Sequence, residues 1–200
     1  MNFNINKYEE IKDFFNKSKF FRKKINNTII AVSKTRKLDD VQEALKHAIR
    51  HFGEIRINEA IDKFTILKNK QKDIQLHMIG AIQSNKVKKA LKIFDHFHSL
   101  DRNGLAVEFS KYPKEISSKS FFIQVNTGNE VQKSGIHPNQ TSEFINYCKK
   151  DLKLNVIGLM CLPPVNDDSK EHFLMLRDLA ENNSLKQLSM GMSSDYKIAI

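Results

Sequence analysis

The sequence is poor in the residues that mark many specialised classes of protein. Its 200 residues include no tryptophan, two cysteines, four prolines and seven glycines. Cys148 and Cys161 form neither a CxxC pair nor a spacing typical of metal ligands, which argues against a metal site and a structural disulfide. No apolar run is long enough to cross a bilayer, and the first ten residues lack the pattern of a secretory signal. We therefore expect an ordered cytoplasmic protein without a metal or a membrane partner.

Acidic side chains are outnumbered, with 33 Lys and Arg against 23 Asp and Glu, a net charge of +10. Such a charge can indicate nucleic acid or an anionic surface. The basic residues are nevertheless spread along the chain, and no aromatic-plus-basic motif accompanies the modest cluster at Lys86, Lys88, Lys89 and Lys92. We favour a solvated basic face over a nucleic-acid site, and a small anionic ligand fits the same charge.

Short apolar runs typical of strands alternate with segments of helical period. The predicted strands are residues 28–32, 51–55, 75–79, 95–99, 120–126, 154–160 and 186–190. One helical face between them consists of Leu38, Val41, Leu45 and Ala48. Each helix must return the chain to the same edge of the sheet, so seven strand-and-helix units in a row predict a parallel α/β sheet.

Two architectures fit a parallel sheet, an open doubly wound sheet and a closed barrel. The units recur evenly, without the glycine-rich first turn of a dinucleotide-binding fold, which favours a (β/α)8 TIM-type barrel. We expect residues 1–200 to form one barrel domain with seven visible strands. Because such a barrel has eight strands, we also expect an eighth unit beyond residue 200, which leaves this domain incomplete at its C-terminus.

Lys34 follows the first predicted strand, in the sequence AVSKT at residues 31–35. That place lies at the carboxyl end of a barrel strand, the face on which barrel proteins build their sites. A lysine partly removed from water loses proton affinity, and its neutral amine can attack an aldehyde. A polar residue is also expected wherever a buried strand reaches the surface, so position alone leaves both interpretations open.

The segment QLSMGMSSD, residues 187–195, repeats this plan at the last predicted strand. Gly191 allows a tight turn, and the hydroxyls of Ser189, Ser193 and Ser194, with nearby backbone N–H groups, can form a cradle for an anion. Barrels often bind phosphate after strands seven and eight. A second interpretation, compatible with the first, is that Ser193 or Ser194 simply caps the next helix.

Other polar residues lie near the same predicted rim. His77 and His98 fall within strands three and four, and we expect hydrogen-bonded core residues there rather than catalysts. Glu54 and Asn126 end strands two and five and are expected to point toward the rim. The loop at residues 130–135 is either a mobile lid or a plain connection.

Eight short segments, taken in order, resemble the pyridoxal phosphate homeostasis family, relatives of the alanine racemase N-terminal barrel. They are AVSKT (31–35), FGEIRINE (52–59), HMIGAIQSNK (77–86), HSLDR (98–102), QVNT (124–127), KSG (133–135), GLM (158–160) and LSMGMSSD (188–195). They span nearly the whole chain in the family's order. The resemblance is therefore far more specific than any single segment.

This resemblance implies a function. It implies that Lys34 forms a Schiff base with pyridoxal 5′-phosphate (PLP), and that the phosphate is held by Ser189, Met190, Gly191, Met192 and Ser193. Family members are regarded as carriers or regulators of PLP supply with no established catalytic turnover. The implied partners are PLP and the apo-enzymes that receive it, and we expect a monomer.

The sequence departs from the family's pattern twice. Ile55 stands where the family has Asn after Gly-Glu, which removes a polar contact near the cofactor. The family's last strand, with a Gly-Ser-Thr phosphate loop and an Arg-Ile-Gly segment, has no counterpart before Ile200. Two alternatives therefore stay open. One is a PLP-dependent racemase-like enzyme, which needs a second acid/base group opposite Lys34, and the other is a truncated remnant that binds no cofactor.

Overall fold

Seven strands follow one another in the predicted order. The computed structural model of the chain describes residues 3–17 and 27–200. The strands are β1 (Ala31–Val32), β2 (His51–Glu54), β3 (Gln75–Met78), β4 (His96–Leu100), β5 (Ser120–Gln124), β6 (Val156–Met160) and β7 (Gln187–Ser189). Every neighbouring pair is parallel, in the order β1 to β7. β1 is shorter than predicted because it pairs with β2 alone, Ala31 with Phe52 and Val32 with Gly53.

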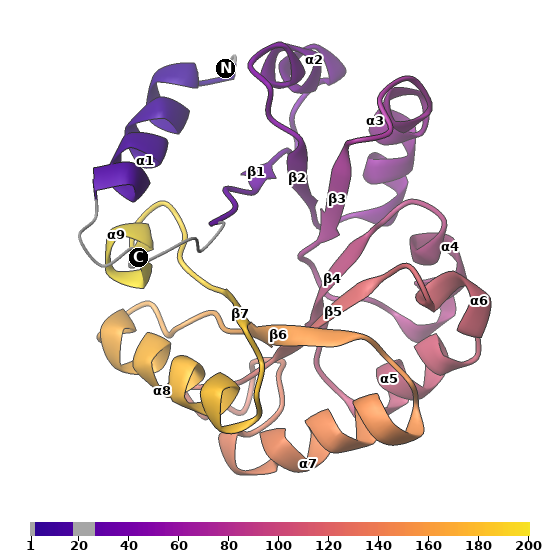
Figure 1. The fold of residues 1–200 in the computed structure, drawn as a ribbon, viewed down its shortest axis with the longest axis vertical. Coiled ribbons are helices and arrows are strands. Elements are labelled where there is room, and N and C mark those ends of the chain that lie inside the picture. Colours follow the sequence, from indigo (N-terminus) through magenta and orange to yellow (C-terminus); the bar gives the residue numbers. More distant parts are fainter. Residues whose placement is uncertain (1–2, 18–26) are drawn as a thin grey trace.

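Helices connect the strands and lie outside them. They are α1 (Ile5–Lys17), α2 (Leu38–Lys46), α3 (Ile57–Lys70), η1 (Ser84–Lys86), α4 (Val87–Leu91), α5 (Asn103–Ser110), α6 (Pro113–Ile116), η2 (Pro138–Gln140), α7 (Thr141–Asn146), η3 (Tyr147–Asp151), α8 (Ser169–Asn182) and α9 (Tyr196–Ala199). The sheet curls into a half-barrel with helices around its outer side (Figure 1), which confirms the predicted TIM-like barrel class. None of the described helices has the length and apolar composition needed to span a bilayer.

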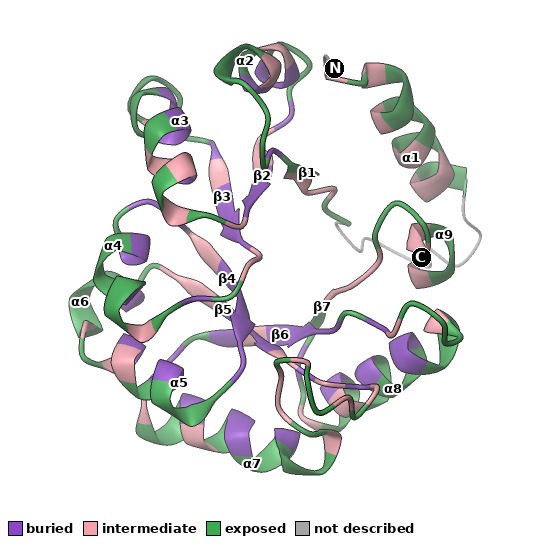
Figure 2. Cartoon of the chain, turned by 180° about the vertical axis from the view of Figure 1, so that it is seen from behind, coloured by how far each residue is buried: buried purple, intermediate pink, exposed green. Residues whose placement is uncertain are grey.

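The core lies between the middle strands and the helices around them. Buried residues gather on β2 to β6 and on the helix faces that touch them (Figure 2). The largest fully buried side chains include six phenylalanines, Phe52, Phe64, Phe94, Phe97, Phe109 and Phe121. Phe97 stacks on Phe121 with ring centroids 5.4 Å apart. Each such ring contributes about 1.5–3 kcal/mol by leaving water, so the middle of the sheet carries most of the stability.

The two edge strands, β1 and β7, are covered differently from the middle strands. α1 and α9 lie beside the opening between β1 and β7 (Figure 1). They touch through Phe14 and Tyr196, whose ring centroids are 6.1 Å apart, and Tyr196 Oη donates to Glu10 Oε1 at 3.2 Å. No residue of α1 is buried. The edges therefore rest on a few partly exposed contacts.

The basic cluster lies on the outer side of one short helical segment. Val87, Ala90 and Leu91 of α4 are buried, whereas the charged residues around them are exposed, namely Lys86, Lys88, Lys89 and Lys92. Lys89 Nζ donates to Asn58 Oδ1 at 2.7 Å. This arrangement supports the interpretation of a solvated basic face.

Candidate functional site

Lys34 lies in the turn that follows β1, at the carboxyl end of the parallel sheet, where the sequence predicts it. Ser33 N–H donates to the Gly53 carbonyl at 3.0 Å, and Arg36 N–H donates to the Ser33 carbonyl at 3.1 Å. Thr35 adopts the left-handed conformation, with φ of 61°, which is uncommon for a β-branched residue. The side chain of Lys34 is exposed to solvent, so the partial burial that the sequence predicts for this lysine is not seen. The reason is that β1 is an edge strand with an open side.

A buried ion pair lies beneath this turn, between the sheet and α3. Lys63 Nζ lies 2.5 Å from Glu54 Oε1 and 3.0 Å from Glu59 Oε1. Lys63 Nζ also donates to the Ser33 carbonyl at 2.6 Å, and Ser33 Oγ donates to Glu54 Oε1 at 2.7 Å. Thr35 N–H donates to Glu59 Oε1 at 2.6 Å. The side chains of Lys63, Glu54 and Glu59 therefore fix this turn through hydrogen bonds to Ser33 and Thr35.

Glu54 corrects the prediction that it points toward the rim. It is fully buried, because Phe52 and Glu54 alternate with Gly53 along β2 and face the helix layer. Burial raises the pKa of Glu59, but the hydrogen bonds from Lys63 and Thr35 outweigh it, so this pKa lies below its ordinary value. Glu59 thus stays ionised beside the lysine.

Several backbone N–H groups in the loop between β7 and α9 have no hydrogen-bond partner among the described residues. Among the described residues, none accepts a hydrogen bond from the N–H groups of Gly191, Ser193 or Ser194. Gly191 has a φ of 84°, and a Cβ at this position would lie 2.7 Å from Ala199 Cβ. The turn therefore requires glycine, and its free N–H groups are suited to binding an anion.

The interpretation that a serine caps the next helix is wrong. Asp195, rather than Ser193 or Ser194, occupies the N-cap position of α9, which begins at Tyr196. Asp195 Oδ1 accepts a hydrogen bond from Met192 N–H at 2.5 Å. Ser193 and Ser194 lie in the preceding turn and are exposed, so neither hydroxyl is used as a cap.

A chain of histidines ties Ser189, the last residue of β7, to the middle of the sheet. His98 Nδ1 lies 2.7 Å from Ser189 Oγ, and His77 Nδ1 lies 2.9 Å from His98 Nε2. His51 Nδ1 lies 3.0 Å from His77 Nε2. Burial lowers the pKa of His98 to about 3 and also lowers that of His77. Both rings are neutral at pH 7, and the prediction of hydrogen-bonded core histidines is confirmed.

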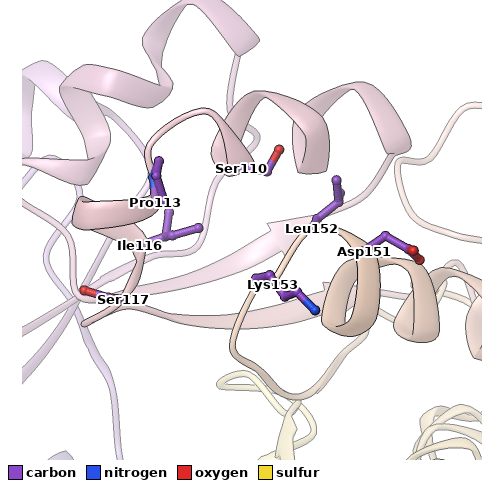
Figure 3. A pocket seen from close by; sticks show the side chains of 7 residues that line it. All are labelled: Ser110, Pro113, Ile116, Ser117, Asp151, Leu152 and Lys153. Atoms are coloured by element: carbon purple, nitrogen blue, oxygen red, sulfur yellow. The ribbon is translucent and has the colours of Figure 1, made fainter.

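Two pockets are formed by described residues, and only one of them lies away from this rim. One, of about 460 Å³, is lined by Ser110, Pro113, Ile116, Ser117, Asp151, Leu152 and Lys153 (Figure 3). These residues precede β5 and β6, so the pocket lies at the amino ends of the strands, opposite Lys34. The other, of about 580 Å³, lies between α1, β1 and α2, and Ser33 and Arg36 on either side of the Lys34 turn are among its lining residues. Neither pocket is lined by Lys34 or by the β7–α9 loop. Across residues 3–17 and 27–200, no group of His, Cys, Asp and Glu side chains is arranged to hold a metal ion.

Comparison with known proteins identifies the family. Residues 13–198 match the family described as alanine racemase, N-terminal domain. The pyridoxal phosphate homeostasis protein of Aquifex aeolicus is 34% identical over 182 residues, which cover 86% of this chain and 79% of that protein. The chain belongs to the pyridoxal phosphate homeostasis family.

Solved structures agree with this assignment. PipY of Synechococcus elongatus PCC7942, in a structure without PLP, is 31% identical with a TM-score of 0.77, covering 85% of this chain and 84% of that chain. The structure of PipY with PLP bound is 26% identical with a TM-score of 0.77, covering 96% of this chain and 91% of that chain. A relative from the same family thus binds PLP on the same fold.

In this family member the structure gathers the predicted site residues at one rim. Lys34 follows β1, and residues 189–193 end β7 and begin the next loop. Asn126 does not offer an open polar group, since its Nδ2 donates to the Glu130 carbonyl at 2.8 Å and its Oδ1 accepts from Glu130 N–H at 3.2 Å. These bonds anchor the loop at residues 130–135, which favours a connection over a lid. Ile55 is half-buried after β2 and brings no polar side chain.

Sequence reasoning missed Lys63, the buried partner of Glu54. The buried residues of α3 are Ala60, Lys63, Phe64 and Leu67. A signal was present, because Lys63 is three residues after Ala60 and four before Leu67, on one face of a helix. Lys63 was passed over because a charged residue is not expected on the buried face of a helix.

Proposed function

We propose that this chain binds PLP at the carboxyl rim of the half-barrel and serves PLP homeostasis. Lys34 Nζ is the point of covalent attachment, and the phosphate lies among Ser189, Met190, Gly191, Met192 and Ser193. The observation that carries the proposal is that Lys34 and the unpaired N–H groups of the β7–α9 loop follow the two strands that flank the opening (Figure 1). PipY, of the same family and fold, has a structure with PLP bound.

The residues present fit both ends of the cofactor. A lysine amine is the group that joins an aldehyde, and PLP supplies that aldehyde on a phosphorylated pyridine ring. The glycine turn at Gly191 has N–H groups that no described residue accepts, and such N–H groups are suited to phosphate oxygens. Lys63, Glu54 and Glu59 orient the turn that carries the attachment point, without reaching the ligand themselves.

We propose that the role is holding and supplying the cofactor, with no catalytic turnover. Racemisation needs two acid/base groups, one on each face of the substrate. His77 and His98 have hydrogen-bond partners at both ring nitrogens, so neither has a free nitrogen to exchange a proton with a substrate. This supports a carrier over the racemase-like alternative.

We also propose a single domain, a reduced cytoplasmic setting and a monomeric state for this protein. One domain across residues 1–200 is supported by a single hydrophobic cluster that runs from Val41 to Leu185. A reduced cytoplasmic setting is supported by Cys148 and Cys161, which are free and buried, with burial raising the pKa of each thiol to about 12. A monomer that hands PLP to apo-enzymes completes the proposal.

The test is an absorbance spectrum after addition of PLP, followed by borohydride reduction and peptide mapping. We expect a new absorbance band and a reduced adduct on Lys34, both lost in Lys34→Ala. Lys37→Ala is the matched control, since Lys37 is exposed and lies three residues along the same loop. An adduct scattered over many surface lysines, unchanged in Lys34→Ala, would contradict the proposal and favour the non-binding alternative.

The racemase-like alternative has its own test. The PLP-loaded protein is incubated with L-alanine and L-serine, and the D-enantiomers are measured by chiral chromatography. We expect none above the rate given by free PLP. Formation of D-amino acids that disappears in Lys34→Ala would replace the carrier proposal with an enzyme.

A further inference from the structure

Three consecutive hydrogen bonds cross the interior of the half-barrel from one end to the other. They join His51 to His77, His77 to His98, and His98 to Ser189, at 3.0, 2.9 and 2.7 Å. His51 is the first residue of β2 and Ser189 is the last of β7, so the chain runs from the amino end of the sheet to its carboxyl rim. At the carboxyl rim the series of hydrogen bonds ends on the hydroxyl of Ser189, which lies in the segment proposed to hold phosphate.

Because the histidines are neutral, the protons in these three hydrogen bonds have only two self-consistent arrangements. A neutral imidazole has one N–H donor and one bare nitrogen acceptor. If Ser189 donates its proton to His98 Nδ1, then His98, His77 and His51 must all carry their protons on Nε2. If His51 donates from Nδ1 instead, all three carry protons on Nδ1, and His98 donates to Ser189 Oγ.

Mixed arrangements are costly because they set two donors or two acceptors against each other. His77 is 5% exposed and His98 1% exposed, so water cannot relieve such a mismatch. His77 is further held between the stacked ring of His96, at 4.4 Å, and the tilted ring of His98, at 5.1 Å. The rings cannot readily turn to repair the pattern, and the protons must move together.

A phosphate at the rim distinguishes the two arrangements. Phosphate oxygens accept hydrogen bonds, so they require Ser189 to donate its proton outward. That is compatible only with the arrangement in which His98 donates to Ser189 Oγ. Without an anion, the Nε2–H form favoured by an isolated neutral imidazole is available to all three rings, with Ser189 donating to His98.

We propose that a phosphate-bearing ligand at the β7–α9 loop reverses the donor–acceptor direction of these three hydrogen bonds. All three histidine protons then lie on Nδ1, and Ser189 donates to the phosphate. His98 and His77 are then positioning residues for the phosphate site. The inference rests on the proposed function, since it takes the phosphate of PLP to lie beside Ser189. It also means that binding at the rim changes the protonated nitrogen of His51 at the far end of the sheet.

The test reads the tautomers directly. The full chain with ¹⁵N-labelled histidine is studied by long-range ¹H–¹⁵N correlation NMR without ligand, with PLP, with pyridoxal and with inorganic phosphate. We expect Nε2–H for His51, His77 and His98 in the free protein and Nδ1–H in all three with PLP or phosphate. Pyridoxal, which has the aldehyde but no phosphate, leaves the tautomers unchanged.

Two variants separate this role from a purely structural one. Ser189→Ala removes the end of the chain, so PLP should no longer alter the tautomer of His51, and PLP affinity should fall about tenfold or more while pyridoxal affinity is kept. His98→Phe keeps a flat ring against Phe122 and should weaken PLP relative to pyridoxal in the same way. A Lys34 adduct with unchanged histidine tautomers would overturn the inference and leave the proposed function standing. If no adduct forms and inorganic phosphate also leaves the tautomers unchanged, both fail.

Discussion

The middle strands and the edge strands of this half-barrel have opposite properties. Each of β2 to β6 has at least three buried residues, whereas β1 and β7 have none. The residues proposed to touch the ligand, Lys34 and the β7–α9 loop, follow the two edges. Chemistry and stability are therefore assigned to different parts of one sheet.

Buried polar groups connect the two regions. Lys63 and Glu54 reach from the interior to the turn that carries Lys34, and His98 reaches from β4 to Ser189. The exposed edge keeps the groups proposed to bind the ligand accessible, and the packed middle fixes their geometry. The proposed site on the weakly packed edges is therefore held in place by residues of other strands and of α3.

The largest contrast is expected in the core. Phe97→Ala leaves a cavity among Phe94, Phe109 and Phe121 and should lower the free energy of unfolding by about 3–5 kcal/mol. Val32→Ala on β1, at a side chain that is 47% exposed, should cost less than about 1 kcal/mol. Urea unfolding monitored by circular dichroism measures both. Equal losses would show that the edge carries more stability than its burial suggests.

The next contrast concerns the connection to β1. Lys63→Met leaves Glu54 buried without its partner and should cost about 3 kcal/mol. It should also slow formation of the PLP adduct on Lys34, because the turn loses its support. Lys70→Met, at an exposed lysine of the same helix, is the matched control and should lie within about 0.5 kcal/mol of the wild type. Wild-type adduct kinetics in Lys63→Met would rule out the positioning role.

At the β7 edge we expect a smaller loss of stability, and the control substitution should change stability in the opposite direction. Gly191→Ala should cost about 1–3 kcal/mol, because alanine must adopt a φ of 84° and its Cβ meets Ala199 Cβ at 2.7 Å. Gly104→Ala in α5, where a Cβ meets nothing within 4 Å, should instead stabilise by about 0.5–1 kcal/mol. Thermal unfolding ranks the two, and PLP titration should show weaker binding in Gly191→Ala alone. The same sign for both changes would contradict this account of the turn.

The sequence predicted the strands and their order because apolar runs and helical periods are local signals. Seven strands were placed within a few residues of their positions, and Lys34 was placed at the correct end of β1. The predicted helical face ending at Ala48 was less accurate. Ala48 lies beyond α2 with φ of 59°, and Ile49 is the buried residue instead. A positive φ is invisible to a periodic pattern.

Contacts between distant strands could not be read in this way. The bond between His98 and Ser189 joins residues 91 apart and depends on how the sheet curls. Lys63 was hidden by its charge, and Glu54 was assigned to the rim because strand alternation gives no absolute direction without the register. Register and curvature place these polar groups, and both arise from packing of the whole sheet.

The last contrast is in pH dependence, and it isolates the buried histidines of the middle strands. Burial lowers the folded-state pKa of His98 to about 3, whereas an unfolded histidine titrates near 6.5. As the pH falls below about 6.5, the unfolded chain takes up a proton that the folded chain does not. Folding stability is therefore fully present above that pH and is lost progressively toward pH 3.

Each histidine of this kind should lower the free energy of unfolding by about 1 kcal/mol between pH 6.5 and 5.5. His98→Phe removes one such group, so its loss over this interval should be about 1 kcal/mol smaller than that of the wild type. Urea unfolding at the two pH values gives both differences, and carboxylates that titrate in the same range cancel in the comparison. Parallel losses in the two proteins would mean that His98 takes up a proton in the folded state. The neutral chain that links the middle strands to Ser189 would then not exist near pH 6.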